Sequence, residues 1–270
     1  MPSVTKCFQL GMLISLCLEL VCGPECASNL TTLNDGSCAI FLGTAGSFCD
    51  ALRICAEHSQ KTGKYFFLTG LDHRVLNSLQ LSAQSQYIWT SINDILVHRG
   101  SAQDGWRDAD PRNLVYVSET RDIDWENHQP NEKDPVVAVR ADTQKASTVP
   151  MNGIEGQVVC RLIEDEVLKP PLTTQLRRDF PLVLSALTNS APSSDGCHQS
   201  ITEPTLVACA IRCQRNIQCR SMYYNVEDHT CVHMLYVDAR LPSVFPLKSE
   251  EWKRFAKTAI TFKSAARGRN

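Results

Sequence analysis

The chain has 270 residues, a formal net charge of −2 at pH 7 and thirteen cysteines. The sequence has neither a large excess of positive charge nor a long basic block. This argues against nucleic acid or an anionic membrane surface as the partner. No stretch approaches the roughly 20 apolar residues of a membrane-spanning helix. The composition therefore disfavours nucleic-acid-binding and membrane-spanning proteins.

Residues 1–22 have the order of a secretory signal peptide, with Lys6 followed by an apolar run from Leu10 to Val21 and then the small residue Cys22. We expect cleavage near Cys22 and a secreted, extracellular protein. The sequon Asn29-Leu30-Thr31 agrees with that location and makes Asn29 a predicted glycosylation site.

Cleavage removes three cysteines and leaves an even set, which in an oxidising compartment indicates a disulfide framework. Its members are the cysteines at positions 26, 38, 49, 55, 160, 197, 209, 213, 219 and 231. Because none lies between Cys55 and Cys160, two separate frameworks are expected. The length of the chain also fits two domains.

The first part of the chain begins with helical patterns and continues with strand patterns. Residues 47–57 repeat apolar side chains at helical spacing, and so does the stretch that Asp72 caps. Three short strands are predicted at residues 87–92, 136–139 and 157–160. Helices followed by loops and short strands predict an α+β fold.

Prolines and polar residues over 164–177 predict a linker. Beyond it, Thr202-Glu203-Pro204 predicts a helix start, and Cys209 and Cys213 share one face of that helix. Two further cysteines follow in segments typical of strands, so disulfides between helix and sheet are geometrically natural. The last residues, 259–270, are predicted to form a basic, solvated tail.

A series of short motifs occurs between residues 26 and 163: Cys26, Cys38, Cys55, residues 89–94, Gly105-Trp106, Trp125, Gln129-Pro130-Asn131 and Val158-Val159-Cys160. In order and spacing they resemble the C-type lectin-like domain. The resemblance implies two helices, short antiparallel strands and one long loop, with bridges Cys26–Cys38 and Cys55–Cys160. The inner bridge that many members have is missing, since its positions hold Pro135 and Met151.

Sugar-binding members of that family hold calcium with a Glu-Pro-Asn or Gln-Pro-Asp motif, to which Gln129 and Asn131 correspond here. Lys133 stands where an acid is expected. The family's Trp-Asn-Asp element is replaced by Ala146-Ser147-Thr148 or, on another alignment, by Met151-Asn152-Gly153. Fewer anionic ligands offset the dehydration of the ion, so we predict no metal, and a calcium-dependent lectin using Gln129 and Asn131 is the alternative.

The second cysteine pattern runs from Cys209-x3-Cys213-x5-Cys219 through Ser221–Asn225 and Cys231 to Glu251–Phe255. It resembles the PAN/apple domain over residues 178–258. The resemblance implies a helix on a small antiparallel sheet, the bridges Cys209–Cys231 and Cys213–Cys219, and binding of proteins or carbohydrates.

Cys49 and Cys197 have no partner assigned by either resemblance. They pair with each other, or Cys49 stays a buried thiol, or Cys197 links two chains. A monomer and a disulfide-linked dimer, the latter as an adhesive or matrix protein, are therefore both open.

The motifs H-E-x-x-H, G-x-S-x-G and the Walker sequence are all missing, so the chain is not expected to be an enzyme. His229, Cys231 and His233 alternate on a predicted strand and could bind zinc only with Cys231 reduced; oxidised, the histidines are expected on the strand surface. The expected function is calcium-independent binding of glycans or glycoproteins by the long loop. The candidate ligand-binding residues are Trp125, Asn127, His128, Gln129, Asn131 and Glu132.

Overall fold

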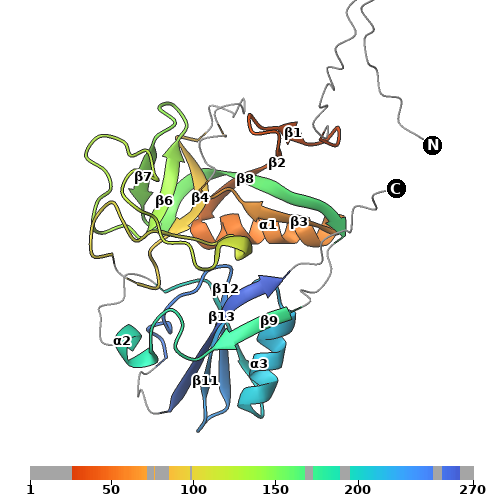
Figure 1. The fold of residues 1–270 in the computed structure, drawn as a ribbon, viewed down its shortest axis with the longest axis vertical. Coiled ribbons are helices and arrows are strands. Elements are labelled where there is room, and N and C mark those ends of the chain that lie inside the picture. The colour runs from red at the N-terminus through yellow and green to blue at the C-terminus, as the bar shows by residue number, and fades with distance from the viewer. Residues whose placement is uncertain are drawn as a thin grey trace, which may run out of the picture.

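The computed structural model describes residues 26–71, 76, 85–97, 99–167, 173–188, 195–245 and 251–261. Two sheets lie one above the other, each with a long helix against it (Figure 1). We call residues 26–167 the first unit and residues 173–261 the second unit. The mixture of helices and mostly antiparallel sheets confirms the predicted α+β class.

The first unit contains β1 (Thr31–Thr32), β2 (Cys38–Ser47), α1 (Phe48–Thr62), β3 (Lys64–Leu68), β4 (Tyr87–Asn93), β5 (Arg107–Asp108), the 3-10 turn η2 (Pro111–Asn113), β6 (Val136–Arg140), β7 (Ala146–Val149) and β8 (Asn152–Val167). Its strands run in the order β1-β2-β8-β4-β6-β7, with β3 paired to β8 and β5 paired to β4. The three strands predicted from the sequence are thus found in β4, β6 and β8.

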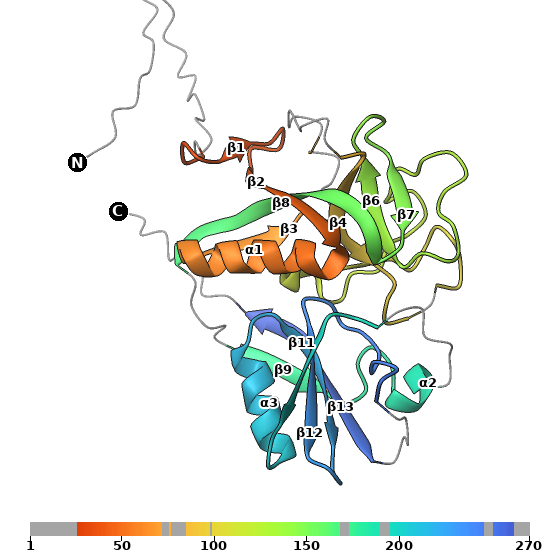
Figure 2. The same cartoon turned by 180° about the vertical axis from the view of Figure 1, so that it is seen from behind.

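The second unit contains β9 (Thr173–Arg177), α2 (Leu184–Thr188), β10 (His198–Thr202), α3 (Leu206–Arg215), β11 (Cys219–Asn225), β12 (Thr230–Leu235) and β13 (Trp252–Thr261). Its strands run in the order β10-β12-β11-β13-β9. Seen from behind, α3 lies along this sheet while α2 stands at its other side (Figure 2). None of the described helices is long and apolar enough to cross a membrane.

Helix α1 begins where the sequence predicts, because Ser47 caps it. The Ser47 hydroxyl accepts a hydrogen bond from the backbone N–H of Asp50, at 3.1 Å. At the other end Gly63 adopts φ 69°, a left-handed conformation that glycine takes without strain. Phe48, Leu52 and other small or apolar side chains form the buried face. The second predicted helix, after Asp72, falls outside the described residues except for one buried position.

Strand β8 is the centre of the first sheet, since it pairs with β2, β3 and β4. Next to it, the Trp89 indole is fully buried and its Nε1–H donates to the carbonyl of Ala45 at 3.0 Å. A side chain at Gly156 would come within 2.8 Å of that indole. Glycine at this position therefore allows the tryptophan to fill the core.

Helix α3 begins slightly later than the sequence predicts, with Thr205 as its N-cap. Its buried face consists of Cys209 and Cys213, as the spacing predicts, and both lie against the sheet. These two cysteines bond to Cys231 of β12 and Cys219 of β11. The bridges therefore fasten the helix to two strands of the second sheet.

The structure contains the other two bridges that the resemblance implied, Cys26–Cys38 and Cys55–Cys160. It also answers the question of the remaining cysteines, because Cys49 of α1 bonds to Cys197 of the second unit. A free thiol at Cys49 and an interchain bond through Cys197 do not fit this pairing. The fifth disulfide joins the two units within one chain.

The strands extend beyond the segments expected to carry them. The sequence predicts a linker over 164–177, but β8 continues to Val167 and residues 173–177 form β9, which pairs with β13. Strand β13 itself runs to Thr261, into the predicted tail. The reason is that β9 covers the open edge of β13 with backbone hydrogen bonds. The domain bounds 26–163 and 178–258 stay predictions.

Two further contacts hold the units together. Arg220 of β11 donates from Nη2 to the carbonyl of Ala109, at 2.7 Å, and Arg240 donates from Nε to the carbonyl of Leu96, at 2.9 Å. The same buried apolar cluster includes Phe48 of the first unit and side chains of the second. The units therefore share a packed interface as well as a disulfide.

Candidate functional site

The long loop, residues 94–135 between β4 and β6, is fixed by a buried ion pair. Arg99 Nε lies 2.6 Å from an Asp94 carboxylate oxygen, and both side chains are almost fully buried. The Arg99 guanidinium stands 3.8 Å above the ring of Trp106, which in turn packs against Trp125 with centroids 5.4 Å apart. This stack gives the loop a rigid interior.

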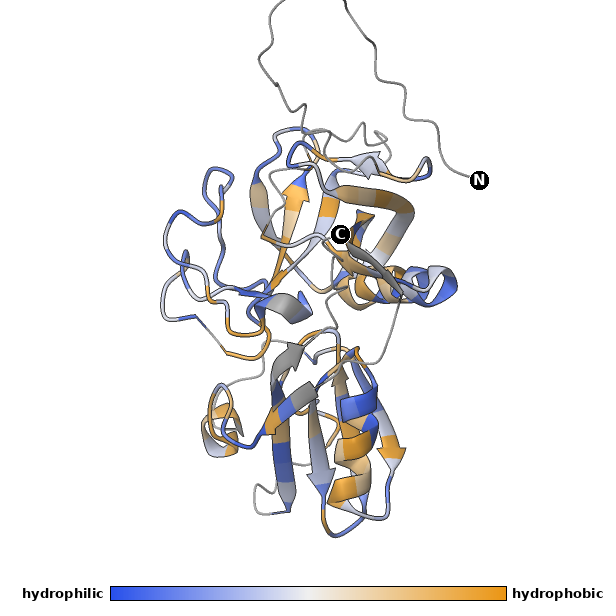
Figure 3. Ribbon diagram, turned by 45° about the vertical axis from the view of Figure 1, so that its right-hand side comes forward, coloured by the Kyte–Doolittle hydropathy of each residue, from blue (hydrophilic) through white to orange (hydrophobic). Residues whose placement is uncertain are grey.

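Strand β7 anchors the second half of the loop. The Glu126 N–H donates to the carbonyl of Ala146, and the Ala146 N–H donates to the carbonyl of Asp124, both at 2.8 Å. Trp125, between them, forms an isolated bridge with Ala146. The side chains that follow Trp125 are therefore held beside β7, and the outer turns of the loop are mostly hydrophilic (Figure 3).

The oxygen of the Gln129 side chain is already occupied. It accepts hydrogen bonds from the Thr148 hydroxyl at 2.7 Å, from the Thr148 N–H at 3.1 Å and from the Asn131 N–H at 3.2 Å. The peptide bond to Pro130 is cis. Two alignments were considered for the Trp-Asn-Asp element. The structure agrees with the one that uses Ala146-Ser147-Thr148, because Thr148 lies next to Gln129.

Asn131 is engaged in the same way. Its side-chain oxygen accepts the backbone N–H groups of Lys133 and Asp134, both at 2.9 Å, and its Nδ2 donates to the Asp134 carboxylate at 2.7 Å. An amide oxygen has two lone pairs, so neither Gln129 nor Asn131 has one left for an ion. The facing position holds the hydroxyl of Thr148 rather than a carboxylate. This donor set does not fit calcium.

The other candidate residues lie further out. Asn127, His128 and Glu132 are exposed, and His128 has φ 64°, whereas Trp125 is half-buried. The six residues thus divide into a hydrogen-bonded scaffold and an exposed rim. Ligand binding by this exposed rim stays a prediction.

A polar cavity of about 190 Å³ opens beside Glu132, and its lining includes Arg99, Gly100, Ser101 and Ala102. Ser101 accepts the Gln103 N–H on its oxygen, and none of the described residues accepts its hydroxyl proton. Among the described residues, no donor binds the Glu132 carboxylate. Sequence reasoning missed residues 99–102, because their approach to Glu132 depends on the buried position of Arg99.

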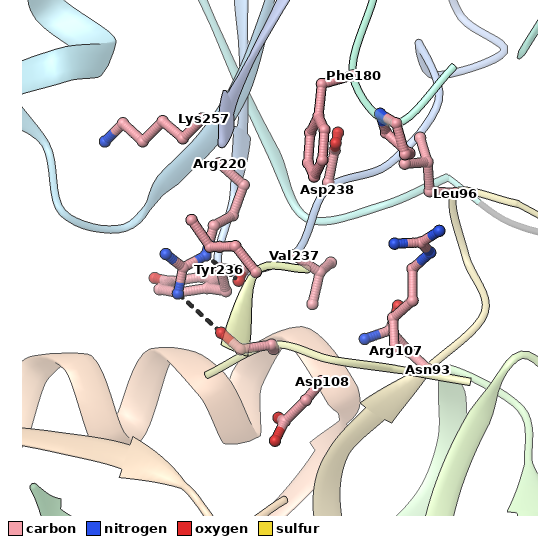
Figure 4. Close-up of a pocket in the computed structure, with 13 residues that line it drawn as sticks. Asn93, Leu96, Arg107, Asp108, Phe180, Arg220, Tyr236, Val237, Asp238 and Lys257 are labelled. Atoms are coloured by element: carbon pink, nitrogen blue, oxygen red, sulfur yellow. Dashed lines mark hydrogen bonds between the residues drawn. The ribbon is translucent and has the colours of Figure 1, made fainter. Parts of the chain in front are cut away.

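The interface between the units encloses a second, smaller cavity of about 40 Å³ (Figure 4). Arg107 and Arg220 line it from the two sides, together with Lys257. Burial lowers the pKa of Arg220 to about 10 and, with the nearby Arg220, the pKa of Lys257 to about 7. A cavity of this size holds a few water molecules. It is part of the packing of the two units.

The zinc alternative does not fit the second unit. Cys209, Cys231 and His233 place their ligand atoms within 4.8 Å, but the two sulfurs are bonded to each other. His233 is 1% exposed and packs near the Cys209 carbonyl, and burial lowers its pKa. The expectation that it is a strand-surface residue is therefore wrong. His229 lies before β12 and shares a hydrogen bond with the Tyr224 hydroxyl, at 2.8 Å.

Residues 190–258 match the family model of the PAN domain, in agreement with the prediction from the cysteine spacing. No curated protein is significantly similar to the chain in sequence.

Among solved structures, the chain is similar to a Ca2+-dependent type II antifreeze protein in its Ca2+-free form, with 16% identity and a TM-score of 0.38, covering 50% of this chain and 98% of that one. It is similar to the C-type lectin CEL-I from Cucumaria echinata, with 14% identity and a TM-score of 0.38, covering 52% and 98%. The third is the C-type lectin domain of murine dendritic cell inhibitory receptor 2 in complex with N-glycan, with 16% identity and a TM-score of 0.37, covering 51% and 98%.

Proposed function

We propose that this chain is a secreted recognition protein without enzymatic activity, and that it binds glycans or glycoproteins through the long loop without calcium. The PAN domain and the set of disulfides fit an extracellular binding protein. The observation that carries the proposal is the Glu132 carboxylate, which has no partner among the described residues and borders a polar cavity beside the closed Gln129 and Asn131 oxygens.

The chemistry of the cavity suits a ligand with several hydroxyl groups. A carboxylate accepts hydrogen bonds on both oxygens, so Glu132 takes two neighbouring hydroxyls, while Ser101 donates to a third oxygen. Asn127 and His128 extend the polar rim. Calcium lectins hold such hydroxyls through the ion; here the protein groups contact them directly. Because each hydrogen bond contributes about 0.5–1.5 kcal/mol, tight binding requires several sugar units.

A glycan and glycoprotein array with the secreted chain tests the proposal, followed by calorimetry on the best ligand in EDTA and in calcium. We expect equal affinities in the two buffers. Glu132→Gln weakens binding by about tenfold, since a hydrogen bond to a charged acceptor contributes roughly 1.5 kcal/mol or more. Glu227→Gln, at an exposed glutamate of the second unit, is the matched control and binds as the wild type does. Binding that disappears in EDTA and returns with calcium would refute the proposal.

A further inference from the structure

The second unit contains a larger cavity, of about 360 Å³, and its lining includes Leu184 and Ser185 of α2. Figure 1 shows where α2 lies beside the second sheet. The cavity lies between residues 178–185 and the first residues of β13. Val183 and Leu184 form an aliphatic wall, and the buried Trp252 also lines the cavity. Its volume falls within the range of about 300–1,000 Å³ that is typical of ligand sites.

Arginine side chains fix the segment that forms one wall of this cavity. Arg254, fully buried, donates to the carbonyl of Phe180, to the Asp238 carboxylate and, at 3.1 Å, to the Tyr223 hydroxyl. Asp238 neutralises the charge of Arg254. Further along, Arg240 Nη1 donates to the carbonyl of Leu187 at 2.8 Å. The segment from 178 to 188 is therefore tied to the core at both ends, and the cavity is preformed.

The mouth of the cavity is positively charged. Arg178 and Lys253 are both exposed and line it, and neither forms an ion pair with another described residue. The acid among the lining residues, Asp179, is paired with Arg177 at 3.1 Å. Val183 is 53% exposed at the same mouth, next to the 39% exposed Leu182. An aliphatic surface thus lies at the same mouth as two cations for which the described part of the chain supplies no ion-pair partner.

We propose that this cavity binds a peptide segment of a partner protein in which an aliphatic side chain stands next to a carboxylate. The side chain enters against Val183 and Leu184, and the carboxylate meets Arg178 or Lys253. Charge complementarity selects an acidic partner, and the aliphatic wall selects a peptide, because a sulfated glycan offers no comparable apolar group to bury. The site is separate from the long loop and does not depend on the function proposed for it.

Selection from a phage-displayed library of random dodecapeptides on the immobilised, secreted chain tests the proposal. We expect enrichment of sequences with Asp or Glu beside Leu, Ile or Val. The best peptide is then synthesised and titrated by calorimetry. Lys253→Glu, Arg178→Glu and Val183→Gln each weaken its binding by about fivefold or more, since each loses one desolvated contact or reverses one charge.

Matched controls come from α3, where Arg215→Glu reverses another exposed cation and Val207→Gln replaces another exposed valine. Both bind the peptide as the wild type does, and so does Glu132→Gln in the long loop. The proposal is overturned if no acidic and aliphatic motif is enriched, or if the selected peptide binds Val183→Gln and Lys253→Glu unchanged. Heparin binding that depends on Lys253, without any enriched peptide, would point instead to a glycan site.

Discussion

The buried amine of Lys257 makes the stability of this protein depend on pH above neutrality. Lys257 is 2% exposed, and its Nζ donates to the carbonyl of Asn216 at 2.8 Å. Burial, and then the nearby Arg220, lowers its pKa from 10.5 to about 7. Between these two values the unfolded chain binds the proton and the folded chain does not. Stability therefore rises with pH across this window and is lowest below it.

The size of the effect follows from the two pKa values. Proton linkage between a folded pKa of about 7 and an unfolded value of 10.5 gives a gain in unfolding free energy of about 2 kcal/mol from pH 7 to pH 9. Other shifted groups contribute little there, since His233 titrates below this window and Arg220, with a pKa of about 10, titrates above it. The interval from pH 7 to pH 9 thus isolates Lys257.

Urea unfolding at pH 7 and pH 9, with the disulfides intact, measures this gain in the wild type and in Lys257→Met. The variant keeps the length of the side chain and removes the charge, so we expect its unfolding free energy to be nearly equal at the two pH values. Lys253→Met, at an exposed position of the same strand, retains the wild-type gain. Equal pH dependence in the wild type and Lys257→Met would show that the amine stays protonated in the interface, against this reasoning.

Three other variants test the packing of the long loop, the joint between the two units and the core of the first sheet. Arg99→Met removes the buried ion pair with Asp94 and should lower the unfolding free energy by about 3–5 kcal/mol, with a change in near-ultraviolet circular dichroism from the tryptophan stack. Replacing Cys49 and Cys197 together by serine removes the disulfide that closes a long loop and should cost about 5 kcal/mol in urea unfolding, while the elution volume in gel filtration stays that of the wild type. Gly156→Ala, which crowds Trp89, should cost about 1–3 kcal/mol by thermal unfolding.

The elements next to the cysteines were predictable from local pattern. The face of α1 with Phe48 and Leu52 and the face of α3 with Cys209 and Cys213 follow from helical spacing, and each helix is capped by a hydroxyl residue at its start. Three strands of the first sheet, β4, β6 and β8, were predicted from short runs of β-branched and other apolar residues, and the others were not. Local spacing, turn residues and caps are sufficient where an element makes its contacts within its own unit.

Contacts between distant segments were not predictable in the same way. The bond between Cys49 and Cys197 spans 148 residues and joins units with separate cysteine patterns. Similarly, the sequence allowed two alignments for the segment that faces Gln129. The contact of Gln129 with Thr148 depends on how β7 packs against the long loop, which the sequence does not show. The burial of Arg99 inside the long loop could not be predicted from sequence periodicity, because Arg99 is a single residue in an irregular segment.

The rigid joint between the units has a consequence for binding. The disulfide of Cys49 with Cys197 and the hydrogen bonds of Arg220 and Arg240 fix the loop cavity relative to the cavity of the second unit. If both sites bind as proposed, a glycoprotein that presents a glycan and an acidic segment at the matching spacing engages them together. Once one site is occupied, the contact with the other site forms within the same complex. The affinity gained from this second contact depends on how well the spacing of the glycan and the acidic segment matches the spacing of the two cavities, rather than on the length of a flexible linker. Two weak sites can therefore act as one selective surface.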